Sequence, residues 1–209
     1  IKKLDWSTQK RSDVGFNNPA RGWAGLADTN KHAGLVFGFD YRHLMNVSSW
    51  GSKGLNALPT LEWRFSEILI PDGDSFRTSF TITPFQGLDK ISGAGPSMVG
   101  AINYEKASGL QSRITATVVS AVTQKASALL RYRVLPVGSW QTILETDVSL
   151  QVDTPLSIAA DFKVATVGTH VLSLIVAADG KELLDLEEPI SIGTPKNDYV
   201  LRQKVKRAR

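Results

Sequence analysis

The chain has 209 residues, of which 42% are hydrophobic and 21% are charged. These proportions are typical of folded domains, so they exclude global disorder, and the length suits one large β domain or two of ordinary size. Cysteine is absent, which excludes disulfides, thiolate metal sites and a cysteine nucleophile.

The net charge of +4 is concentrated at the C-terminal end, where the last eight residues hold five basic side chains and no acid. No aromatic side chain lies among these charges to stack on bases, so we expect no nucleic-acid partner. Residues 194–209 are interpreted as a basic tail or linker.

No apolar run approaches the ~20 residues of a membrane-spanning helix, and no signal peptide is visible. We therefore expect no membrane span. The chain begins with Ile1 rather than methionine, which favours a processed or excised piece. The absence of cysteine does not indicate the cytosol, and a periplasmic or secreted location is the favoured expectation.

Short strands and loops are predicted from the N-terminal end onward. Residues 23–27 and 34–39 are short runs rich in β-forming side chains, separated by a polar break. Residues 40–58 carry several Gly, Ser and Asn, and we expect them to form a long loop with at most one turn of helix.

The next elements complete the first half. Residues 60–65 alternate apolar and polar side chains, as a half-buried strand does. The sequence Pro-Asp-Gly-Asp at 71–74 predicts a turn, and residues 75–84 read as the clearest strand of this half. Residues 91–111 are rich in glycine at their start and lack periodicity there, which predicts a linker between two domains.

Alternation is more regular in the second half. Strands are predicted at residues 112–119, 128–135, 140–150, 156–164, 170–177 and 183–192. Asp179 and Gly180 lie between the last two and form a strong hairpin signal. About seven short strands with evenly spaced turns predict an immunoglobulin-like or fibronectin type III-like sandwich over residues 112–193.

Reactive side chains are few. None of the three histidines, His32, His43 and His170, has metal-ligand spacing to another histidine or carboxylate, so neither a metal nor a cofactor is predicted. His170 lies in an alternating strand, where a structural or surface role is expected. His43 lies in the long predicted loop with Trp50, and loops on a rigid sheet are where binding groups gather.

The first half contains four of the five tryptophans, Trp6, Trp23, Trp50 and Trp63. Indole faces stack on the C–H faces of sugar rings, and nearby carboxylates or amides orient the sugar hydroxyls. A carbohydrate site is therefore one interpretation of this region. The other is that these tryptophans are large core residues of a β-sandwich.

A succession of short motifs gives this half a resemblance to a known superfamily. Trp-Ala-Gly-Leu-Ala-Asp at 23–28 is followed by Gly-Leu-Val-Phe at 34–37, a tryptophan-bearing loop, Pro-Thr-Leu-Glu-Trp at 59–63 and Leu-Ile-Pro-Asp-Gly-Asp-Ser-Phe at 69–76. This order resembles the C-terminal part of a galactose mutarotase-like β-supersandwich. The resemblance covers about the first 90 residues.

The resemblance implies a role for one residue. Glu62 falls where aldose epimerases carry a catalytic glutamate, a general base that removes the anomeric hydroxyl proton. Those enzymes pair it with a histidine acid supplied from earlier in the sandwich, and the complete fold needs about 250 residues or more. The remainder of the same protein is thus a further expected partner, beside a carbohydrate ligand.

The sequence therefore predicts an all-β chain: a mutarotase-like β-sandwich portion at 1–90, a linker at 91–111 and an Ig-like sandwich at 112–193. The expected function is carbohydrate binding, or association with carbohydrate processing, without catalysis by the chain alone. The predicted site comprises Glu62 as the tentative catalytic residue and Arg42, His43, Trp50 and Trp63 as ligand-binding residues. Two alternatives remain open, a structural or adhesive surface protein without sugar affinity and an aldose epimerase-like enzyme.

Overall fold

The structure is a computed structural model that describes residues 14–17, 22–50, 60–106, 110–164 and 166–192. The side chains of residues 14–17, 41, 49, 50 and 106 are not among those described. The predicted tail at 194–209 also lies outside the described residues, as do 1–13, 18–21, 51–59, 107–109, 165 and 193.

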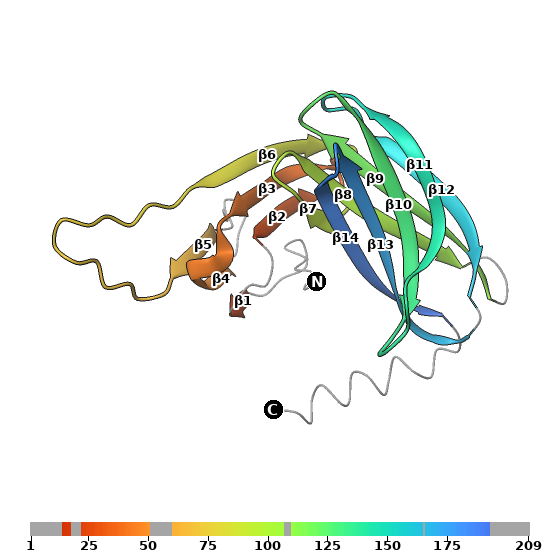
Figure 1. Cartoon of the computed structure of the whole chain (residues 1–209), viewed down its shortest axis with the longest axis horizontal. Coiled ribbons are helices and arrows are strands. Elements are labelled where there is room, and N and C mark those ends of the chain that lie inside the picture. The colour runs from red at the N-terminus through yellow and green to blue at the C-terminus, as the bar shows by residue number, and fades with distance from the viewer. Residues whose placement is uncertain (1–13, 18–21, 51–59, 107–109, 165, 193–209) are drawn as a thin grey trace. The chain divides into compact units, whose positions relative to one another are not determined.

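The described residues form strands almost throughout, with one turn of 3-10 helix (η1), which confirms the all-β prediction (Figure 1). The elements in chain order are β1 Val14–Asn17, β2 Trp23–Asp28, β3 Ala33–Phe39, η1 Tyr41–His43, β4 Leu44–Trp50, β5 Thr60–Phe65, β6 Phe80–Gln86, β7 Gly93–Ala94, β8 Met98–Lys106, β9 Gln111–Ser120, β10 Gln124–Val134, β11 Gln141–Leu150, β12 Leu156–Lys163, β13 Gly168–Ala178 and β14 Lys181–Ile192.

Backbone contacts divide the chain into two compact units, and each is described by itself. Unit 1 comprises residues 1–26 and 36–82, and unit 2 comprises residues 27–35 and 83–209. Two three-stranded sheets, β1-β4-β5 and β2-β3-β6, account for the strands of the first half. Two four-stranded sheets, β12-β9-β8-β7 and β11-β10-β13-β14, account for those of the second half.

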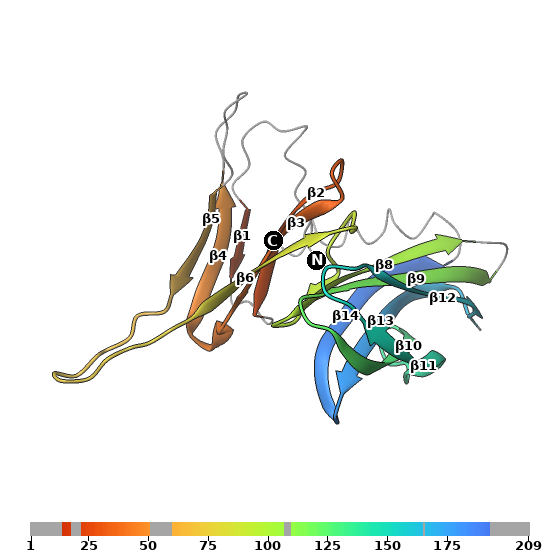
Figure 2. The same cartoon turned by 90° about the horizontal axis from the view of Figure 1, so that it is seen from above.

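The two four-stranded sheets of unit 2 lie as separate layers with an apolar interior (Figure 2). Alternation along each strand sends every second side chain inward. On β10, for example, Ala128 and Leu130 are buried at 1% exposure, whereas Ser127, which points to the opposite face of the strand, is exposed. Leu172 and Leu174 of β13 and Leu186 of β14, in the same sheet, are fully buried, as are Met98 and Ile102 of β8 in the facing sheet. All strands predicted in this half are present, within a few residues of the predicted bounds.

The hairpin predicted at Asp179 and Gly180 is also present. Ala178 of β13 pairs with Lys181 of β14, so Asp179 and Gly180 form the whole turn. Both have positive φ, 51° at Asp179 and 71° at Gly180. A two-residue turn of this kind matches the right-handed twist of the strands that it joins, which is why the short sequence signal was sufficient.

The linker predicted at 91–111 is wrong for most of its length, because it contains β7 and the long core strand β8. Met98 and Ile102 of β8 are fully buried, and β8 pairs with β9 from Met98 to Lys106. The glycines that suggested flexibility are sites of close approach instead. A Cβ at Gly95 would lie 2.1 Å from the carbonyl oxygen of Leu183.

Two predictions in the first half are corrected as well. The predicted loop at 40–58 contains β4, although η1 confirms the single helical turn expected there. Leu44 and Val47 of β4 are buried. A register shift between Leu44 and Asn46 accompanies their spacing of three residues, so the sequence here lacks the two-residue alternation of a regular strand. The strand predicted at 75–84 begins only at Phe80.

Candidate functional site

Strand β5 has one apolar and one polar face. Its residues alternate between half-buried and exposed: Leu61, Trp63 and Phe65 are half-buried, whereas Glu62 and Arg64 are exposed. Successive side chains of a strand point to opposite faces. Glu62 and Trp63 therefore point away from each other and belong to different surroundings.

Trp63 packs among aromatic rings. Its ring centroid lies 5.2 Å from that of Phe80, 6.0 Å from that of Phe39 and 6.1 Å from that of Phe37, all in tilted arrangements. These spacings are typical of stabilising aromatic pairs. Trp63 is thus a packing residue of unit 1, which agrees with the second of the two interpretations of the tryptophans.

Glu62 lies on the polar face of the β4–β5 strand pair. The register places Ser48 directly opposite Glu62, Asn46 opposite Arg64 and Trp50 opposite Thr60. Position 50 is therefore a diagonal neighbour of position 62 on the same face of the strand pair. The side chain of Trp50 lies outside those that the structure describes.

His43 ends the helical turn η1 and is exposed. Its ring meets the Phe76 ring edge-on at 5.7 Å between centroids, and its carbonyl oxygen accepts the Ser66 N–H at 2.8 Å. Ser66 lies four residues beyond Glu62, which along an extended chain corresponds to about 13 Å. The structure thus separates His43 from Glu62.

Arg42 is held by a neighbouring carboxylate. Its Nε donates to Oδ1 and Oδ2 of Asp40 at 2.9 and 3.1 Å, and its Nη2 donates to Oδ2. The Arg42 backbone N–H also donates to Oδ1 at 3.1 Å. The side-chain hydrogen bonds of Arg42, with help from the backbone N–H, lower the pKa of Asp40 from 3.8 to about 2.

The other two histidines have structural surroundings. His32 is exposed and contacts the Asp89 carboxylate through Nδ1. His170 is fully buried, and its Nδ1–H donates to the Gly168 carbonyl oxygen at 3.0 Å. Its ring lies 6.1 Å from that of Tyr132, so the structural role expected for His170 is confirmed.

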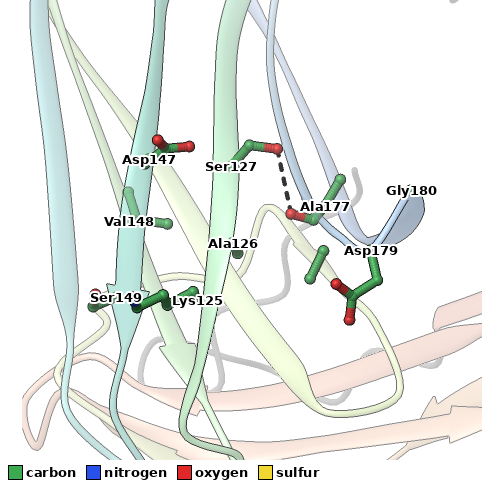
Figure 3. Close-up of a pocket in the computed structure, with 10 residues that line it drawn as sticks. Lys125, Ala126, Ser127, Asp147, Val148, Ser149, Ala177, Asp179 and Gly180 are labelled. Atoms are coloured by element: carbon green, nitrogen blue, oxygen red, sulfur yellow. Dashed lines mark hydrogen bonds between the residues drawn. The ribbon is translucent and has the colours of Figure 1, made fainter.

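A groove of about 620 Å³ lies in unit 2, near the Asp179–Gly180 turn (Figure 3). It is lined by Lys125, Ala126, Ser127, Asp147, Val148, Ser149, Ala177, Ala178, Asp179 and Gly180. The Ser127 hydroxyl donates to the Ala177 carbonyl oxygen at 3.3 Å and so closes part of its floor. None of the predicted site residues lines this groove.

The described residues also bear on two other kinds of site. They contain no cluster of three or more His, Asp or Glu side chains arranged to hold a metal ion. They also contain no helix of the length and apolar character required to cross a bilayer. Comparison of the whole sequence with protein-family models and with curated proteins finds no match.

Proposed function

We propose that this chain is a carbohydrate-binding β-sandwich protein whose ligand contacts the polar face of β4 and β5. The observation that carries the proposal is the register that makes Trp50 and Glu62 diagonal neighbours on one face. An indole offers a flat surface for the C–H face of a sugar ring, and a carboxylate beside it accepts hydrogen bonds from sugar hydroxyls.

The rest of this face supports the same chemistry. Ser48 and Asn46 of β4 lie opposite Glu62 and Arg64 of β5. The four side chains supply a hydroxyl, an amide, a carboxylate and a guanidinium, which together offer donors and acceptors to a ligand rich in hydroxyl groups. The apolar face of the same strands is occupied by the Trp63 cluster, which gives the polar face a rigid support.

Binding is favoured over catalysis by the distance between Glu62 and His43. An epimerase needs a base and an acid on the two sides of one sugar ring. In the enzymes that this half resembles, a histidine from earlier in the sandwich supplies the acid, and His43 does not replace it, because about 13 Å of extended chain separates its position from that of Glu62. The proposed role of Glu62 is therefore to orient a bound sugar. The mutarotase-like family remains part of the proposal for residues 23–85.

For unit 2 we propose an immunoglobulin-like or fibronectin type III-like accessory module with a structural role. Support comes from the strand order, in which β12-β9-β8 form one sheet and β11-β10-β13-β14 the other. Consecutive strands thus change sheets three times, between β9 and β10, between β11 and β12 and between β12 and β13. Such crossings are the feature shared by sandwich domains of this kind.

The test is a glycan-array screen followed by calorimetry with the captured sugar. We expect Trp50→Ala and Glu62→Ala each to weaken binding about tenfold or more, because each removes a central contact. Trp140→Ala and Glu67→Ala are the matched controls, since they remove an indole and an exposed carboxylate elsewhere in the chain.

Unchanged affinity in both site variants would remove this site from the proposal. A chain that captures no glycan at all would favour the structural or adhesive alternative. Turnover of an aldose that Glu62→Gln abolishes would instead favour the epimerase-like alternative.

A further inference from the structure

Residues 66–79 connect β5 to β6 as a long two-legged arm (Figure 2). Its legs, residues 66–70 and 75–79, are extended, and neither belongs to a β-strand. The tip is a turn in which the Asp74 N–H donates to the Pro71 carbonyl oxygen at 3.0 Å, with Gly73 at a φ of 84°. We call residues 66–79 the arm.

The root of the arm is held by aromatic contacts. Phe76 on the second leg is half-buried, and its ring lies 5.7 Å from that of Phe65 at the end of β5. The His43 ring meets Phe76 at the same centroid distance. Beyond Phe65 the first leg continues for five residues before the turn, which corresponds to roughly 15 Å of extended chain. On the second leg Phe76 lies two residues after the turn residue Asp74.

The first leg exposes three consecutive large apolar side chains. Leu69 is 92% exposed, Ile70 49% and Ile68 37%. In an extended segment Ile68 and Ile70 point to one side and Leu69 to the other. A run of exposed apolar residues on a segment with a fixed root marks an interaction site rather than ordinary surface.

The charges of the arm indicate what covers it. Glu67, Asp72 and Asp74 are exposed acids, whereas Arg77 is the single basic residue among 66–79. A partner that buries Leu69 therefore brings its own side chains close to an excess of carboxylates. Charge complementarity favours basic side chains on that partner, and the same carboxylates disfavour insertion into an anionic membrane.

We propose that the first leg of the arm adds as a strand to the sheet edge of a partner protein whose edge strand alternates apolar and basic side chains. The extended legs present backbone N–H and C=O groups that a second strand can pair. Docking buries Leu69, the most exposed of the three side chains, in an apolar position of the partner, and the basic side chains meet Glu67, Asp72 and Asp74.

The probe for this proposal is a fluorescent synthetic peptide that alternates valine and lysine, titrated with the full chain and followed by anisotropy. We expect Leu69→Ser to weaken binding about tenfold, since it removes the most exposed apolar contact. The double variant Asp72→Asn, Asp74→Asn should weaken binding and flatten its dependence on salt. A peptide with alternate amides N-methylated should not bind, because it cannot complete the ladder.

Val137→Ser is the matched control, because Val137 of unit 2 is 90% exposed and the change removes the same kind of contact. It should leave the affinity unchanged. The proposal is overturned if the lysine–valine peptide does not bind, if a glutamate–valine peptide binds as well, or if Leu69→Ser has no effect. Self-association or binding to phosphatidylcholine vesicles that Leu69→Ser abolishes would equally overturn it, in favour of a second copy or a membrane.

Discussion

Asp40 and Arg42 form the best-defined charged contact of unit 1. Their positions two residues apart allow the guanidinium and the backbone N–H of Arg42 to reach one carboxylate. Hydrogen bonds to the charged form of a carboxyl group favour ionisation, which is the cause of the low pKa of Asp40. Arg42 therefore stabilises the turn that begins β4, apart from any role in ligand binding.

This contact predicts the titration of Asp40. The carboxyl carbon should titrate with a midpoint of about 2, and Arg42→Gln should raise the midpoint toward the ordinary 3.8. Because the folded pKa is depressed, any stabilisation from the pair is fully present above pH 3.8 and is lost as the pH falls through about 2. Carbon-detected NMR measures both midpoints, and equal values in the two proteins would contradict the assignment.

The presence of a tryptophan such as Trp63 does not by itself indicate whether the residue binds a ligand or packs in a core. An indole on an alternating strand is compatible with a sugar platform and with a core. Its three aromatic neighbours come from β3 and β6, far away in the sequence. Alternation along β5 agrees with the exposed positions of Glu62 and Arg64 and with the half-buried position of Trp63, but it does not show which residues Trp63 packs against.

Strand β8 shows how an element can be misread from its composition. Four glycines between residues 87 and 100 suggested a flexible junction. In the structure Gly95 lies against the Leu183 carbonyl, and a Cβ at Gly100 would lie 2.7 Å from a methyl group of Leu186. Gly93, Gly95 and Gly100 are required because backbone and side chains of β14 approach these positions too closely for any larger residue.

We therefore expect Gly95→Ala to destabilise unit 2 by about 1–3 kcal/mol, the usual cost of overpacking. The nearby substitution Ser97→Ala adds no atoms and should change the free energy of unfolding by less than about 0.5 kcal/mol. Urea denaturation followed by circular dichroism compares the two variants. A Gly95→Ala protein as stable as the wild type would mean that β7 is not packed against β14 as described.

At the scale of the whole molecule, the sequence has no cysteine and therefore forms no disulfide. Unit 2 is stabilised by its apolar interior. Its core also includes a charged and polar contact at one edge: Glu188 accepts the Ser92 hydroxyl at 2.9 Å and meets the Lys90 ammonium at 3.2 Å. The buried N–H of Ile102 donates to the same Ser92 hydroxyl. These contacts bind the segment just before β7, which carries Lys90 and Ser92, to β14, the last strand of the sandwich.

A matched pair of leucines tests this division between interior and surface. Leu174 is fully buried, whereas Leu69 is 92% exposed. Leu174→Ala should lower the free energy of unfolding by about 2–5 kcal/mol, and Leu69→Ala should change it by less than about 0.5 kcal/mol. Thermal and urea unfolding measure both, and similar losses in the two variants would contradict the burial described for unit 2.

The sequence by itself determined the all-β class, the strands of the second half, the Asp179–Gly180 hairpin and the exposed face of Glu62. Each of these depends on neighbours within a few residues, because alternation and turn chemistry are local properties. The exposed apolar run of the arm also stands in the sequence, between the predicted strand at 60–65 and the predicted turn at 71–74, but it was assigned to neither.

Only the tertiary structure decided that β4 and β8 are strands, that Trp63 is a packing residue and that His43 lies far from Glu62. These outcomes depend on register and on the approach of residues distant in the chain, here β4 to β5 and β8 to β14. Such pairings are selected by packing of the whole fold, which no local pattern of side chains specifies.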